Sequence, residues 1–139
     1  MKESRFKFKN PVLESVIFGI NENFNEEEYE GVEISGITKV KKRNGKNEAM
    51  VEFTLEIGEK SSTVPFYIDL TMKAEFKWTN DMRNEMLDKL LKANAPSLLL
   101  SYMRPIVANL TGSSKFPMFN IPYMDMSENE VEFEELVGE

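Results

Sequence analysis

The chain of 139 residues contains neither cysteine nor histidine. Without cysteine there is no disulfide bond, no thiol nucleophile and no thiolate zinc site. Without histidine the most common general base near neutral pH is missing, and the serines and threonines of the TGSS and GEKSST segments have no visible partner to activate them. The sequence therefore predicts a protein that is not an enzyme, with no catalytic residue, no metal site and no cofactor.

The seven glycines are scattered along the chain and form no phosphate-binding loop. Asp125, Ser127 and Asn129 stand at alternate positions, as the ligands of a calcium loop do. Such a loop needs a glycine where this chain has Glu130, and a bidentate glutamate where it has Leu136. We therefore expect no calcium binding by this segment.

Long apolar runs are also missing, and none approaches the ~20 residues of a membrane span. The first ten residues, MKESRFKFKN, have no apolar core of an export signal. Hydrophobic residues make up 41% of the chain and charged residues 29%, which is typical of a globular protein. We expect a cytoplasmic protein without membrane insertion.

The excess of negative charge lies at the C-terminal end. Residues 125–139 hold seven acidic residues and no basic one, while the other acidic residues equal the 17 basic ones in number. A phosphate backbone would be repelled by this tail, so we expect no nucleic-acid binding. We predict a single domain over residues 1–127, followed by a mobile acidic tail over residues 128–139 that promotes solubility.

A period of two in the first half of the chain predicts four antiparallel strands. Residues 49–57 and 64–78 alternate between apolar and polar, and a weaker strand over residues 32–40 ends at Asn44-Gly45, a pair typical of tight hairpins. The lysines and arginine around that pair are interpreted as a solvated hairpin tip. The first strand covers residues 5–20, is bent at Pro11, and has these apolar residues on one face: Phe6, Phe8, Val12, Val16, Phe18 and Ile20.

After residue 78 the apolar spacing changes to that of helices. We expect Thr79 or Asn80 to cap a first helix, and Pro96 to begin a second one that is kinked at Pro105 and ends at Gly112. The predicted fold is α+β, with a four-stranded antiparallel sheet followed by two helical segments. The second helix has more apolar surface than one sheet can cover, so we expect it to form a subunit interface through Leu98, Leu99, Tyr102, Met103, Ile106 and Leu110.

The segment KFPMFNIPYMDM, residues 115–126, combines many large apolar side chains with two prolines that exclude a regular helix or central strand. Two interpretations remain open. The segment packs over the sheet as core, or it forms a peptide-binding surface made of Phe116, Met118, Phe119, Ile121, Tyr123, Met124 and Met126.

A spaced motif runs through residues 94–121: a proline, a short apolar run, Tyr-x-Arg, an apolar helix, a polar turn and then Phe-Pro. The matching residues are Pro96, Tyr102, Arg104, Phe116, Pro117 and Ile121. In this order and spacing the region resembles the signature of the SecB family of export chaperones. The resemblance implies an α+β fold assembled as a homotetramer, a dimer of dimers, that holds unfolded or partly folded polypeptides in apolar grooves without ATP. It also implies that the segment after the helix forms part of such a groove.

The resemblance has departures as well. SecB proteins that act in export dock the motor ATPase SecA through acidic residues on the outer sheet face. Those positions are Ser15 and Gly19 here, and Asp69 alone keeps the charge as a possible docking residue, so SecA is a doubtful partner. Two functions remain open: a general chaperone for non-native chains, in export or elsewhere, or an oligomeric partner of one specific folded protein, such as a component of a toxin–antitoxin system.

Overall fold

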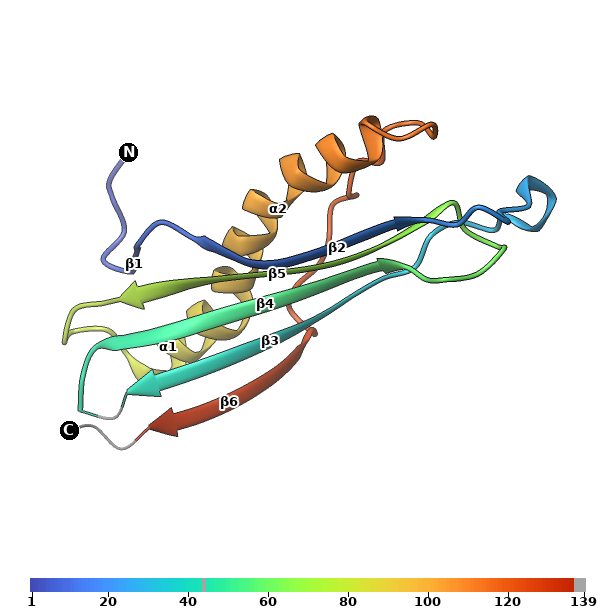
Figure 1. Ribbon diagram of the computed structural model, residues 1–139. Helices are drawn as coiled ribbons and strands as arrows, with labels where there is room; N and C mark the ends of the chain where they lie inside the picture. The colour runs from blue at the N-terminus through green and yellow to red at the C-terminus, as the bar shows by residue number, and fades with distance from the viewer. Residues whose placement is uncertain (44, 137–139) are drawn as a thin grey trace.

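The computed structural model describes residues 1–43 and 45–136, and in them one sheet is covered on one face by one long helix (Figure 1). The sheet has six strands in the order β1-β5-β4-β3-β6, and β2 also pairs with β5. The strands are β1 (Lys7–Phe8), β2 (Val12–Ile20), β3 (Ile34–Arg43), β4 (Glu48–Gly58), β5 (Phe66–Lys77) and β6 (Glu130–Leu136). The predicted α+β class is confirmed, but the prediction of four strands is wrong.

The alternation predicted for the two central strands is present in β4 and β5. Phe53 and Leu55 of β4 and Ile68 of β5 point into the core under the helix, where Leu99 and Met103 are also fully buried. The opposite face carries polar side chains and is open to water. A sheet that is apolar on one face only needs a single covering layer, and the helix provides it.

The strand predicted over residues 5–20 departs from its predicted pattern in two ways. It is interrupted at Pro11, so that β1 and β2 pair separately with β5. The register then shifts between Leu13 and Ser15, which places Leu13 opposite Met72 and Val12 opposite Lys73. Because a bulge of one residue exchanges the two faces of a strand, Val12 lies on the outer face, contrary to the predicted pattern.

The two predicted helical segments form one continuous helix, made of α1 (Asn84–Lys89), the π-helical turn η2 (Leu90–Asn94) and α2 (Ala95–Gly112). The helix begins at Asn84, later than the predicted caps at Thr79 or Asn80. A π turn has wider hydrogen-bond spacing and accommodates the missing N–H of Pro96. The helix therefore continues through Pro96, and the predicted break at this proline is wrong. No helix in the described part of the chain is long and apolar enough to cross a membrane.

The acidic C-terminal segment also differs from its prediction. Residues 130–136, expected to lie in a mobile tail, form strand β6, which runs parallel to β3. Of the lysines predicted at a hairpin tip, Lys46 lies in the turn. The others lie in β3, where Lys39, Lys41 and Lys42 are in register with Glu132, Glu134 and Glu135. The register thus sets acidic residues beside basic ones across this strand pair, an arrangement that favours pairing over one of like charges. Residues 137–139 lie outside the described part of the chain.

The β3–β4 hairpin forms where the sequence predicts it. Gly45 has a φ of +80°, which favours glycine, and the Lys46 amide donates to the Arg43 carbonyl at 3.3 Å. The predicted turn partner Asn44 is outside the described residues.

Candidate functional site

A groove of about 550 Å³ opens at the end of the molecule where three loop segments meet. One wall comes from the long loop between β2 and β3, which contains the short 3₁₀ helix η1 (Glu26–Glu28). The second comes from the residues around the start of β5, and the third from the segment that follows α2. Its lining consists of Phe24, Glu26, Tyr29, Val32, Pro65, Phe66, Phe116, Pro117, Met118 and Phe119.

Aromatic side chains build the walls of this groove. The ring of Phe24 meets those of Phe116 and Tyr29 edge to face, with centroids 5.6 Å and 6.0 Å apart. Phe119 meets Phe66 in the same way at 5.6 Å. Such pairs fix the rings against one another across segments distant in the chain. Beside them Met118 and Tyr29 remain 54% and 46% exposed, so apolar surface is open to solvent.

Two side chains of α2 hold the groove-forming segment in place. The buried Thr111 hydroxyl donates to the Val107 carbonyl and accepts from the Phe119 amide, both at 2.8 Å. The Arg104 guanidinium donates to the carbonyls of Ile121 and Pro122, the latter at 3.0 Å. These bonds satisfy a stretch of backbone that has no regular secondary structure.

The opposite wall is held by the side chain of Asn21. Its amide donates to the carbonyls of Glu59 and Val64 at 2.7 Å and 2.9 Å, which ties the end of β2 to the loop before β5. The Asn25 amide N–H donates to the Ser62 carbonyl at 2.8 Å. Phe24 is therefore carried on a loop with fixed ends.

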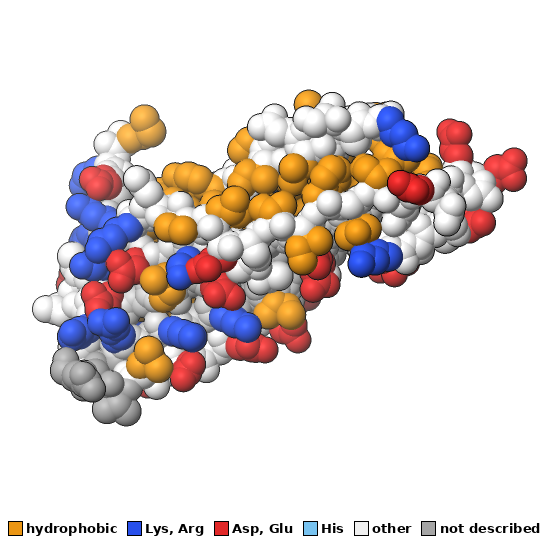
Figure 2. All heavy atoms as spheres, viewed as in Figure 1, with side chains coloured by type: hydrophobic (Ala, Val, Ile, Leu, Met, Phe, Trp, Pro, Cys, Tyr) orange, Lys and Arg blue, Asp and Glu red, His pale blue; other side chains and the backbone are white. Residues whose placement is uncertain are grey.

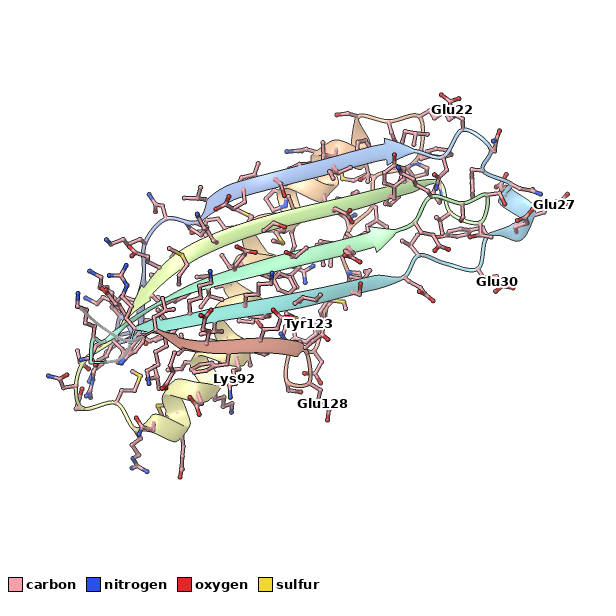
Figure 3. All side chains as sticks on the ribbon, turned by 60° about the horizontal axis from the view of Figure 1, so that its bottom comes forward. Glu22, Glu27, Glu30, Lys92, Tyr123 and Glu128 are labelled. Atoms are coloured by element: carbon pink, nitrogen blue, oxygen red, sulfur yellow. The ribbon has the colours of Figure 1, made fainter. Side chains whose placement is uncertain are left out.

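Three of the predicted peptide-binding residues line the groove, and the other four lie outside it. Phe116, Met118 and Phe119 line the groove together with Pro117. Ile121 is buried in the core, and Met124 and Met126 are half-buried where the segment crosses between the helix and β3. Tyr123 is 95% exposed and lies beside the start of β6, away from the end that carries Glu27 and Glu30 (Figure 3).

Sequence reasoning missed the other half of the groove, contributed by Phe24, Tyr29, Val32, Pro65 and Phe66. The available signal was a pair of aromatic residues, Phe24 and Tyr29, on either side of three glutamates in an otherwise polar loop. No pattern in the sequence brings that loop next to the segment after α2, because Phe24 and Phe116 are 92 positions apart in the chain.

Acidic residues surround this end of the molecule. Glu26 is in the groove lining, and Glu22, Glu27 and Glu30 project from the same tip (Figure 3). Basic residues lie at this end as well: the Lys115 ammonium is 5.4 Å from the centre of the Phe116 ring, and the Lys60 ammonium is 5.2 Å from the centre of the Tyr67 ring. Within the described residues these acids form no group of three arranged to hold a metal ion.

A second apolar surface runs along β2 and the neighbouring helix (Figure 2). Val12, Leu13 and Ile17 of β2 are 53%, 47% and 56% exposed, on a strand whose outer edge has no partner in the described chain. Of the predicted interface residues, Leu99 and Met103 are fully buried inside the subunit. Tyr102 is exposed next to Phe8, and the half-buried ones are Leu98, Ile106 and Leu110.

Asp69, the predicted docking residue, is exposed on the outer face between Ile17 of β2 and Glu56 of β4. Gly19 lies opposite Tyr67, and a Cβ at residue 19 would come within 2.2 Å of the Tyr67 hydroxyl oxygen. An acidic side chain at this position would therefore require Tyr67 to move.

Comparison with known proteins gives one family and two related folds. The family model described as SecB, preprotein translocase subunit SecB, matches residues 8–135. A SecB-like chaperone of Mycobacterium tuberculosis, Rv1957, solved in complex with a ChAD peptide from the antitoxin HigA1, superposes with a TM-score of 0.68 at 14% identity, covering 86% of this chain and 91% of that one.

A protein of unknown function from Streptococcus agalactiae superposes with a TM-score of 0.52 at 12% identity, covering 85% of this chain and 97% of that one. No curated protein sequence matches significantly. At these identities the two solved structures establish likeness of fold.

Proposed function

The chain belongs to the SecB family, and from this premise we propose that it is an ATP-independent chaperone that holds non-native polypeptides in the aromatic groove. The observation that carries the proposal is the exposure of Met118 and Tyr29 in a groove whose other walls are fixed aromatic rings. A protein that did not use this surface would gain stability by closing it, because exposed apolar area costs free energy.

The groove suits extended segments with varied side chains. Each client side chain that is well buried contributes ~1.5–3 kcal/mol before the cost of ordering the client. The flexible thioether of Met118 adapts to side chains of different shape. The acidic rim formed by Glu26 and its neighbours attracts client segments that carry lysine or arginine beside their apolar residues.

We also propose that the chain assembles as a homotetramer, a dimer of dimers, through the second apolar surface. The unpaired outer edge of β2 with Ile17, and the helix face around Tyr102 and Ile106, are the parts not used inside the subunit. Several grooves in one assembly bind one client chain with higher avidity than a single groove.

A second candidate function is recognition of one dedicated partner. The SecB-like chaperone of Mycobacterium tuberculosis was solved with a peptide from an antitoxin, which supports this candidate by analogy of fold. Docking to SecA is not included in the proposal, because Ser15 and Gly19 supply no charge next to Asp69.

The test is suppression of aggregation of several unrelated denatured proteins, followed by light scattering. A general chaperone suppresses aggregation of all of them, and a dedicated partner suppresses none or one. Met118→Ser combined with Tyr29→Ser should weaken client binding by roughly tenfold, since about 1.4 kcal/mol of lost apolar contact corresponds to that factor.

The matched control is Met86→Ser, which removes an apolar side chain of 58% exposure on α1, outside the groove. It should leave client binding unchanged. Equal losses in the control and the groove variant, or full activity of the groove variant, would contradict a client site in the groove.

A further inference from the structure

Strand β6 is an edge strand that is attached to the fold mainly through its pairing with β3. It pairs with β3 in parallel, whereas the other strand pairs in the described sheet are antiparallel. Of its apolar side chains Val131 packs against the core only in part, and Phe133 is 36% exposed beneath the Lys92 ammonium at 5.1 Å. An edge strand with so little buried apolar surface is among the first elements to open.

Charge, more than burial, matches β6 to its neighbour. Glu132 and Glu134 stand opposite Lys39 and Lys41 on the outer face, and Glu135 stands opposite Lys42 on the helix side. The row at Lys39 continues across the sheet with alternating sign, through Glu52 of β4 to Lys73 of β5. Lys73 in turn forms an ion pair with Glu14, which lies at the bulge of β2. A strand laid on the β3 edge in this register places outward acidic residues beside Lys39 and Lys41, which favours such a strand over one with outward basic residues.

The start of β6 lies close to the segment that leaves the groove. Residues 113–129 connect α2 to β6 without a regular element, and Glu128 and Lys92 lie at this strand (Figure 3). The Asn129 side-chain amide is hydrogen-bonded to the buried Thr38 hydroxyl at 2.7 Å, which marks the first fixed point of the strand. Detachment of β6 beyond this point exposes the β3 edge and leaves the groove walls intact.

We propose that the β3 edge is a strand-addition site for an extended, acidic segment of a polypeptide partner with apolar residues at alternate positions, and that β6 is the chain's own removable occupant of this site. The inference deepens the proposed function, because the occupant is taken to be a segment of a client. Backbone hydrogen bonds to the edge supply affinity, and Lys39, Lys41 and Lys42 supply the preference for acidic residues. Because β6 competes for the β3 edge, only partner segments that pair with this edge better than β6 does gain access to it.

The test uses the full chain and a fluorescent peptide with the sequence of residues 128–136, ENEVEFEEL. Binding is measured by anisotropy for two variants that change only the attachment of β6. The first weakens β6 through Val131→Ser with Phe133→Ser. The second locks it by a disulfide between Ile37→Cys and Glu130→Cys, directly opposite residues in a chain with no other cysteine. Neighbouring strands lie ~4.8 Å apart, within the Cα range of disulfides.

The weakened variant should bind the peptide roughly tenfold more tightly than the unmodified chain, because the tethered strand competes at a high effective concentration. The oxidised locked variant should lose binding and regain it on reduction. Lys39→Glu with Lys41→Glu, added to the weakened variant, should reduce its affinity for the peptide roughly tenfold. A peptide with lysine in place of every glutamate should bind the weakened variant roughly tenfold less tightly as well.

Equal affinity of the weakened and locked variants, or no peptide binding to the weakened variant, would overturn the inference. The groove variant with Met118→Ser and Tyr29→Ser serves to separate this site from the groove. It should bind the peptide normally while failing to suppress aggregation. If the chain fails to suppress aggregation but the weakened, unmodified and locked forms differ in peptide affinity as expected, the groove proposal fails and the β3-edge proposal stands. If aggregation is suppressed but these forms bind the peptide equally, the β3-edge proposal fails and the groove proposal stands.

Discussion

At the scale of single residues, Thr111 connects the helix to the groove. Its hydroxyl is buried, donates to the turn before it, where the carbonyl oxygens of Val107 and Ala108 lie at 2.8 Å and 3.3 Å, and accepts from the Phe119 amide. A threonine within a helix usually bonds only to its own helix. The bond from the Phe119 amide therefore fixes the segment after the helix and adds nothing to the helix itself. Through this bond the position of the Phe119 ring depends on one hydroxyl group.

Thr111→Val keeps the shape of the side chain and removes the hydroxyl. We expect a loss of about 1–3 kcal/mol in the free energy of unfolding, because the Phe119 amide is left without its acceptor. Urea denaturation measures this loss, and hydrogen exchange should show faster exchange of the Phe119 amide. Thr111→Ser is the control, since it keeps the hydroxyl and should keep the amide protected. Unchanged protection in the valine variant would mean that other contacts hold the segment.

At the scale of elements, the periodicity of apolar residues predicted the central strands and the helix. The alternation in β4 and β5 and the 3.6 spacing of the helix follow from which side chains face the core, so they were visible in the sequence. The hairpin at Gly45 was visible for a similar reason, because it requires a positive φ.

What the sequence did not reveal depends on contacts between distant segments. The bulge after Leu13 changes the face of Val12, and no local signal marks it. The π turn keeps the helix continuous past Pro96, where a local rule predicts a break. Strand β6 reads as a disordered acidic tail until it is placed beside the lysines of β3.

The groove was predicted on one side only. The segment with Phe116 and Phe119 was identified because its apolar residues and prolines are unusual for a loop. Phe24 and Tyr29 became part of the site only through the fold. Prediction of a site from one chain segment therefore finds the side chains and not the cavity between them.

At the scale of the whole molecule, the exposed band along β2 predicts self-association. Ile17 is 56% exposed on the outer face, so Ile17→Lys should leave the subunit folded. In an assembly that buries this band, an unpaired charge costs several kcal/mol, and the variant should dissociate. Sedimentation should give a multiple of 16.1 kDa for the unmodified chain and a smaller particle for the variant.

Met86→Lys is the matched control, since it introduces the same charge at an apolar side chain of similar exposure, 58%, on α1. It should leave the mass of the assembly unchanged. A single-chain mass for the unmodified protein at micromolar concentration would contradict the proposed assembly and leave the groove proposal untouched.

Binding of non-native chains in the aromatic groove is tested most directly by photo-crosslinking with an unfolded model protein. A benzophenone side chain is introduced at Met118 in the groove, or at Met86 on α1 or Asp69 on the outer sheet face as controls. We expect efficient crosslinks from residue 118 and few from residues 86 and 69. Equal yields at the three positions, or crosslinks from the controls alone, would contradict it.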